Sequence, residues 1–196
     1  MGVVVLVEPE VPENTGFIAR LCSNFDWELR LVNPDFSLDM CRETAAGCQE
    51  KLDEAVIFDT LERSIENLDF IVGTKPERGV LLEDFEGVSR SLDGLGLVFG
   101  PESRGLSNDE LELCDVTVHI GTCEYNSLNL SHAAGICMYS FTSRNGSSAE
   151  LVGEGEKEFL SSFLGSDSIL YELLLRSGIS RDEFNRLVDE LKTLEN

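Results

Sequence analysis

Three short polar stretches contain the side chains that could do chemistry: ENTGFIAR (13–20), FGPESRGL (99–106) and EYNSLNLSHA (124–133). Amides and hydroxyls hydrogen-bond a ligand, glycine allows a close backbone approach, and arginine binds anions such as phosphate. In the second stretch, backbone amides could cradle a polar ligand while Glu102 and Arg104 supply charge. The stretch has neither the G-x-G-x-x-G nor the G-K-[ST] spacing, so it is not a dinucleotide fingerprint or a phosphate loop.

Each polar stretch follows an apolar segment that predicts a β-strand. A run such as GVVVLV is typical of a buried parallel strand, and apolar residues recur at helical spacing in the segment that follows it. The expected strands are 2–7, 28–34, 68–74, 94–100 and 116–120, and the expected helices are 15–25, 61–67, 107–114 and 128–144. The segment 44–58 is expected to begin as a helix and to close in a short strand.

The alternation of strands and helices predicts an α/β domain with a mainly parallel sheet and helices on both faces. Ligands of such sheets bind at the carboxyl ends of the strands, so the three polar stretches and the loop GTKPERG (73–79) should form one pocket. Two caps are predicted there. Ser107 followed by Glu110 is a capping box, and Asn14 can cap the helix 15–25, whose Gly16 permits close approach.

The net charge of −22 arises from 37 acidic and 15 basic residues. Acids spread through every segment, with few lysines, favour a protein adapted to high intracellular salt, where screening shortens repulsion. The alternative is an ordinary acidic protein. Affinity for nucleic acid comes largely from neutralised phosphates, so an RNA-binding function must depend on a few placed cations.

Length and composition indicate one globular domain with a small appendage. No apolar run reaches the roughly 20 residues of a membrane span and no signal peptide is recognisable, so we expect a soluble cytoplasmic protein. The six cysteines form no C-x-x-C pair, which favours reduced, mostly buried thiols and no metal site. A polar, glycine-containing segment near residue 146 separates a domain 1–148 from an extension 149–196 with three short amphipathic helices.

Three ordered motifs carry a family resemblance: N-x-G-x-x-x-R (14–20), G-x-E-x-x-G-L (100–106) and N-S-L-N-L-S-x-A (126–133). Together they resemble the SpoU/TrmH class of SPOUT methyltransferases, and most closely its TrmJ-like enzymes, which methylate a ribose in the tRNA anticodon loop. The resemblance covers about residues 2–145. It implies a homodimer with a C-terminal trefoil knot, which periodicity cannot predict because knots are nearly absent from the usual topologies.

The reaction that the resemblance implies moves a methyl group from S-adenosylmethionine to an RNA 2'-hydroxyl, without a metal. A sulfonium methyl is already activated, so the enzyme mainly positions the reactants in line and helps to remove the hydroxyl proton. Lys75 has an alternative role as a solvated loop charge. By position in the motifs, the implied cofactor-binding residues are Thr74, Lys75, Pro76, Gly100, Glu102, Gly105, Leu106, Ile120, Asn126, Ser127 and Leu128.

Arg20 matches the catalytic arginine of the family. Its high pKa favours holding the target phosphate and lowering the pKa of the hydroxyl, although a role as base stays open. Ser127 and Asn129 are expected beside the ribose, Asn14 is expected to shape the Arg20 loop, and Glu102 to fix the motif loops or face an arginine across the dimer. Alternatively, Arg20 is a surface residue paired with a carboxylate of its own helix, Glu13 or Asp26.

Three functions remain open at this point. The leading hypothesis is a tRNA 2'-O-ribose methyltransferase acting on cytidine or uridine at position 32. The same chemistry on ribosomal RNA and a catalytically silent RNA- or cofactor-binding protein are the alternatives. RNA contacts are expected from Arg78, Arg104 and Arg144. His119 and His132 are expected to be packing or surface residues, and the small residues 133–135 are expected to pack against a second subunit.

Overall fold

The computed structural model describes residues 1–85 and 93–146, and of these residues 1–85 and 93–144 belong to one compact α/β unit. Its centre is a seven-stranded sheet with the order β3-β2-β1-β6-β4-β7-β5, and every strand pair in it is parallel. The mainly parallel sheet is therefore confirmed. Its strands are β1 (Gly2–Val7), β2 (Trp27–Val32), β3 (Val56–Phe58), β4 (Phe70–Thr74), β5 (Val80–Leu81), β6 (Leu95–Phe99) and β7 (Val116–His119).

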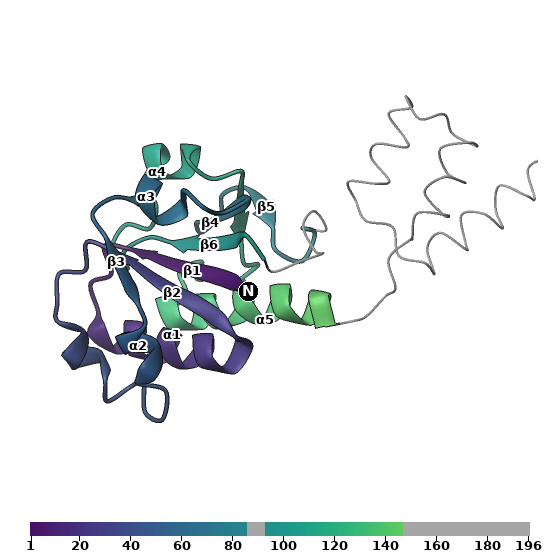
Figure 1. The fold of residues 1–196 in the computed structure, drawn as a ribbon. Coiled ribbons are helices and arrows are strands. Elements are labelled where there is room, and N and C mark those ends of the chain that lie inside the picture. The colour runs from purple at the N-terminus through teal and green to yellow at the C-terminus, as the bar shows by residue number, and fades with distance from the viewer. Residues whose placement is uncertain (86–92, 147–196) are drawn as a thin grey trace, which may run out of the picture. The chain divides into compact units, whose positions relative to one another are not determined.

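Helices cover both faces of the sheet, as predicted. Figure 1 shows α3 and α4 on one face and α1, α2 and α5 on the other. The helices are α1 (Pro12–Phe25), the 3-10 helix η1 (Leu38–Cys41), α2 (Glu50–Asp53), α3 (Leu61–Ile65), α4 (Asn108–Glu112) and α5 (Leu130–Gly146). No helix among the described residues is long and apolar enough to cross a membrane.

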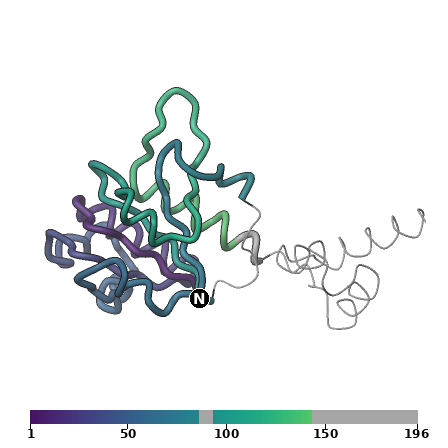
Figure 2. Tube along the Cα trace, turned by 90° about the horizontal axis from the view of Figure 1, so that it is seen from above, coloured from purple at the N-terminus to yellow at the C-terminus, as the bar shows by residue number. Residues whose placement is uncertain are grey.

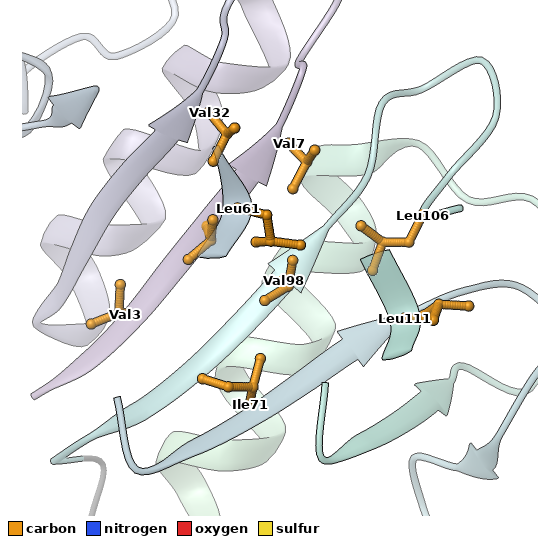
Figure 3. Packing of buried hydrophobic residues seen from close by; sticks show 9 residues of the cluster. Val3, Val7, Val32, Leu61, Ile71, Val98, Leu106 and Leu111 are labelled. Atoms are coloured by element: carbon orange, nitrogen blue, oxygen red, sulfur yellow. The ribbon is translucent and has the colours of Figure 1, made fainter. Parts of the chain in front are cut away.

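The core explains why β1 is apolar at every position. All six of its residues are buried, because successive side chains point to opposite faces and both faces are covered. Val3, Val5 and Val7 pack on the face with α3 and α4, in the cluster drawn in Figure 3 with Leu61 and Leu111. The alternate residues of β1 are buried on the opposite face, beneath α1 and α5.

Helices α1 and α5 pack on each other within the same chain. A Cβ built at Gly135 of α5 would lie 3.4 Å from Leu21 of α1, and Ala134 is fully buried. The indole of Trp27 also donates to the Thr142 hydroxyl at 3.0 Å. The expectation that residues 133–135 pack against a second subunit is therefore wrong for Ala134, whose side chain belongs to the core of its own chain.

Two local predictions are wrong. Helix α1 begins at Pro12 after an N-cap at Val11, so Asn14 lies inside the first turn and caps nothing. Proline is favoured at the first helical position, which moves the start three residues earlier than expected. In the segment 44–58 only the short helix α2 forms, because the chain turns through Gly47 at φ +82. The closing strand, β3, is present.

Other local predictions are confirmed. Ser107 and Glu110 form the expected capping box of α4, with reciprocal bonds of 3.2 and 2.6 Å. The two-residue strand β5 was not predicted, because a run this short has no readable period. The helical extension 149–196 and its linker lie outside the described residues, and the trefoil knot stays a prediction.

Candidate active site

One cavity lies at the carboxyl ends of four neighbouring strands, β1, β6, β4 and β7. Its volume is about 630 Å³, and its lining comes from the segments that follow these strands and from the first turn of α5. Figure 2 shows the longest of these segments, the green loop 120–129, projecting from the sheet. The predicted cofactor-binding residues that line the cavity are Thr74, Lys75, Pro76, Gly100, Glu102, Gly105, Ile120, Asn126, Ser127 and Leu128.

Leu106 is the one predicted cofactor-binding residue that does not line the cavity. Its side chain is fully buried in the core cluster. The backbone carbonyl of Leu106 accepts a hydrogen bond from the ammonium group of Lys75, so Lys75 is anchored to the protein rather than free in solvent. Leu106 therefore supports the floor of the cavity and acts on it through Lys75.

A chain of side-chain hydrogen bonds joins the three motifs. The Asn14 amide donates to Glu102 at 2.8 Å, and the Asn129 amide donates to the Asn14 oxygen at 2.9 Å. The Asn129 oxygen in turn accepts from the backbone and the hydroxyl of Ser131, at 2.9 and 2.7 Å, which caps the start of α5. Glu102 also accepts from the backbone of Glu10 at 2.9 Å. The polar residues of the motifs thus hold three loops in one arrangement.

The loop 100–106 is further fixed by charge. Glu10 accepts from the backbone and hydroxyl of Ser103 at 2.9 and 2.7 Å. Arg104 forms ion pairs with Glu8 at 2.8 Å and with Glu110 at 2.9 Å. The hydrogen bond from Arg104, with further bonds from Ser107, lowers the pKa of Glu110 below its usual value, although partial burial opposes this.

Glycine is required where this loop turns back on β6. A Cβ at Gly100 would lie 2.3 Å from the carbonyl carbon of Gly105 and 2.3 Å from the backbone nitrogen of Leu106, closer than real Cβ contacts. Gly105 itself has φ +65, a conformation that other residues rarely adopt. Both glycines of the second motif are therefore required by the backbone geometry of this loop.

The upper wall of the cavity is the loop 120–129. The Thr122 hydroxyl donates to the Asn126 oxygen at 3.0 Å, and the Asn126 amide donates to Glu77 in the loop after β4. Ser127 is exposed and lines the cavity, and its hydroxyl has no partner among the described residues. Of the motif side chains on this wall, Ser127 is therefore the one free to bind a ligand.

Arg20 lies on the exposed side of α1 and does not line the cavity of its own chain. Its side chain forms no ion pair with Glu13 or Asp26, and no other ion pair or hydrogen bond with the described side chains of residues 1–85 and 93–142. The alternative of a helix-surface pair is therefore wrong for the described part of the chain. Asn14, Ser127 and Asn129, the other predicted catalytic residues, do line the cavity.

Sequence reasoning missed several lining residues. Val11 lies three residues before the first motif, Tyr125 directly precedes the third, and Cys137 lies one helical turn beyond Ala133, so helical spacing could have indicated Cys137. His119 lines the cavity too, although it was expected to be a packing or surface residue. Its Nδ1 atom is buried and has no hydrogen-bond partner among the described residues. No group of metal-ligating side chains occurs in the described part of the chain.

Comparison with known proteins shows the family to which this chain is similar. The family model of the SpoU rRNA Methylase family matches residues 1–139. The tRNA (cytidine-2'-O-)-methyltransferase TrmJ of Methanocaldococcus jannaschii is 36% identical over 149 residues, which are 69% of this chain and 65% of that protein. The tRNA (cytidine/uridine/adenosine-2'-O-)-methyltransferase TrmJ of Pseudomonas aeruginosa is also 36% identical over 149 residues, 69% of this chain and 58% of that protein.

A similar solved structure also concerns methylation of tRNA. It is described as "Structural insights into the 2-OH methylation of C/U34 on tRNA", is 28% identical with a TM-score of 0.63, and covers 73% of this chain and 94% of its own. The chain spans less than two thirds of the length of the two curated relatives. The family model, however, matches well over half of the chain and includes all three motifs. The chain therefore belongs to the SpoU rRNA methylase family.

Proposed function

We propose that this protein transfers a methyl group from S-adenosylmethionine to a ribose 2'-hydroxyl of tRNA. The observation that carries the proposal is the hydrogen-bonded chain Glu102–Asn14–Asn129, which joins the three motifs at the edge of one cavity. The names of the two curated relatives support tRNA as the substrate class.

The cavity fits a nucleoside cofactor. A volume of about 630 Å³ lies within the usual range for small-molecule sites. Apolar Ile120 and Leu128 can flank a flat ring, and His119 offers a buried nitrogen that lacks a partner among the described residues. When bound, S-adenosylmethionine supplies an activated methyl group. The residues proposed to hold it are the predicted ones that line the cavity, with Leu106 acting through Lys75.

The catalytic side chains divide into two kinds. Both polar atoms of the Asn129 amide are hydrogen-bonded within the protein, so Asn129 positions the loop and the start of α5. The Ser127 hydroxyl has no partner in the described part of the chain, and Ser127 is the side chain proposed to approach the ribose. Arg20 has no carboxylate partner among the described side chains, which suits it to hold the target phosphate and to lower the pKa of the 2'-hydroxyl electrostatically. Deprotonation of the hydroxyl is then easier near neutral pH.

A homodimer is part of the proposal. Phe17 of α1 is 45% exposed, and Ile136 and Tyr139 of α5 are 42% and 63% exposed, on helices that pack together. Large apolar side chains gathered in this way mark association surfaces. Phe17 and Arg20 lie three residues apart and share a side of α1. Association through this side would bring the Arg20 of one subunit toward the cavity of the other.

Two nucleotides of the anticodon loop are candidates for methylation. Position 32 of the anticodon loop follows from the resemblance to TrmJ-like enzymes, whereas the similar solved structure concerns C/U34. Both positions lie in the anticodon loop, so the two alternatives differ only in which nucleotide of that loop enters the cavity. We propose a tRNA anticodon-loop ribose at position 32, with position 34 as the neighbouring candidate.

The cellular setting and the remaining segment complete the proposal. A tRNA substrate implies a cytoplasmic protein, and the net charge of −22 suits a protein that works at high salt. Residues 149–196 are proposed to form the helical extension that their sequence predicts, beyond a methyltransferase domain of residues 1–148.

The test incubates the purified protein, at molar salt, with labelled S-adenosylmethionine and either tRNA or rRNA from a strain lacking the gene. Label in tRNA ribose, mapped to one anticodon-loop nucleotide, is the expected result. Label in rRNA alone would show the rRNA alternative to be right. Binding of the cofactor without transfer to either RNA would indicate a silent binding protein.

A further inference from the structure

In so acidic a protein, a lysine or arginine side chain can bind an RNA phosphate best when no carboxylate of the protein already pairs with it. Eight lysine and arginine side chains lie in the part of the chain with described side chains, and most form ion pairs. Those with a carboxylate partner are Arg30, Arg42, Lys51, Arg63 and Arg104. Those without one are Arg20, Lys75 and Arg78.

Arg104 is poorly suited to bind a phosphate, although it lies within the second motif. Its guanidinium contacts two carboxylates, those of Glu8 and Glu110, through three hydrogen bonds. A phosphate would have to displace these partners or bind beside their negative charges, and both cost free energy. This arrangement does not favour the RNA-contact role expected for Arg104, because its charge is paired with two carboxylates that fix the loop 100–106.

Arg78 is held differently. It is exposed, and its guanidinium donates one hydrogen bond to the side-chain oxygen of Asn108, the first residue of α4. Asn108 is neutral, so the bond orients Arg78 without reducing its charge, and further N–H groups stay available. Such an oriented fork matches the bidentate geometry of phosphate.

The loop around Arg78 is fixed on both sides. Glu77 adopts φ +57, a left-handed conformation that costs energy for a residue with a side chain. Glu77 accepts from Asn126 in the loop 120–129, while its neighbour Arg78 reaches α4 in the other direction. The backbone of Lys75 also donates to Val118 at 3.1 Å. These bonds hold the loop that carries Arg78 at the carboxyl end of β4, on the same edge of the sheet as the cavity.

We propose that Arg78 binds a backbone phosphate of the RNA substrate and that Arg104 does not. The inference rests on the proposed function, because it names a contact for the RNA that the cavity would methylate. One phosphate neutralised by Arg78 contributes about one unit to the slope of log Kd against log salt concentration.

The experiment measures the affinity of the full chain for fluorescently labelled tRNA over a series of salt concentrations in which circular dichroism shows it folded. The variants are Arg78→Gln, Arg104→Gln and Asn108→Ala, with Arg63→Gln on α3 as a matched exposed control. We expect Arg78→Gln to weaken binding and to reduce the salt slope by about one. The other three variants should retain the slope, and Arg78→Gln, Asn108→Ala and Arg63→Gln should bind S-adenosylmethionine as the unchanged protein does.

Two outcomes would overturn the proposal: an unchanged slope in Arg78→Gln, or a loss of slope in Arg104→Gln equal to that in Arg78→Gln. If Asn108→Ala lowers the slope as much as Arg78→Gln, loop position and not charge is responsible, and the phosphate contact is refuted. Methylation of tRNA by the unchanged protein separates the two levels. A protein that methylates tRNA while Arg78→Gln binds normally refutes this contact alone, whereas one that neither binds nor methylates tRNA refutes the proposed function as well.

Discussion

The Asn129 amide donates a hydrogen bond of 2.9 Å to the side-chain oxygen of Asn14, a residue 115 positions earlier in the chain. Asn14 is 5% exposed and also donates to Glu102, so both ends of its amide are used inside the protein. One buried side chain thus ties the first turn of α1 to the loop after β6 and to the start of α5. The arrangement of the cavity edge depends on this link.

Removing the link should cost stability and cofactor affinity together. Asn14→Ala leaves Glu102 and Asn129 each short of a partner, and we expect it to lower the free energy of unfolding by about 1–3 kcal/mol. Urea unfolding at constant salt measures this, with calorimetry for S-adenosylmethionine. In a double-mutant cycle, the double variant Asn14→Ala, Asn129→Ala should lose less free energy of unfolding than the sum of the two single variants, because the two residues share one hydrogen bond. Asn24→Ala, on the exposed side of α1, is the control, and strictly additive costs would contradict the link.

Two helical glycines should respond in opposite directions to alanine. At Gly16 a Cβ would lie 2.0 Å from the Thr44 hydroxyl and 2.3 Å from the Cys41 carbonyl, so Gly16→Ala should destabilise by about 1–3 kcal/mol. At Gly135 the nearest atom would be a Leu21 methyl at 3.4 Å, an ordinary contact, and alanine favours helix by up to about 1 kcal/mol. Thermal unfolding should show a lower midpoint for Gly16→Ala only, and equal losses would contradict the packing described for α1.

The sequence was sufficient to predict the elements that carry the site. Strand runs such as GVVVLV are legible because a strand covered on both faces must be apolar throughout. The capping box of Ser107 and Glu110 is local, so it too could be predicted. Because parallel strands end at one sheet edge, the sequence of strands and helices already implies that their loops form one cavity.

What the sequence could not predict depends on contacts between distant residues. Nothing local distinguishes Asn14 as a helix cap from Asn14 as a bridge to Glu102 and Asn129, since both use the same amide. The difference between Arg104 and Arg78 likewise lies in which carboxylates are near, and Glu8 is 96 residues from Arg104 in the chain. Long-range pairing therefore decided the roles that motif spacing left open.

Buried thiols should make the protein less stable in alkali. Burial raises the pKa of Cys22 and Cys137 from 9.0 to about 12. The neutral thiol is thus favoured in the folded state, and its contribution to stability is complete below pH 9 and is lost as pH rises from 9 toward 12. Above pH 9 the free energy of unfolding should fall by up to about 1.4 kcal/mol per pH unit for each such thiol.

The check compares urea unfolding between pH 8 and 10.5 for the unchanged protein and for Cys22→Ala. We expect the variant to have a shallower alkaline slope, because one thiol no longer ionises on unfolding. Cys123 is exposed, so Cys123→Ser should leave the slope unchanged. An identical slope in Cys22→Ala would show that this thiol is not protected by burial.

Arg20 should act on the cavity of a second subunit, because it does not line its own. The test is a purified heterodimer of two differently tagged chains, Arg20→Ala and Gly100→Val, the second of which blocks its cavity by the contact with Gly105. If Arg20 works across the interface, the intact cavity of the first chain receives the arginine of the second, and about half of the methylation activity should return. A heterodimer of the unchanged chain with Gly100→Val controls for dimer assembly. Activity in this control but none in the mixed pair would show that Arg20 serves the cavity of its own chain.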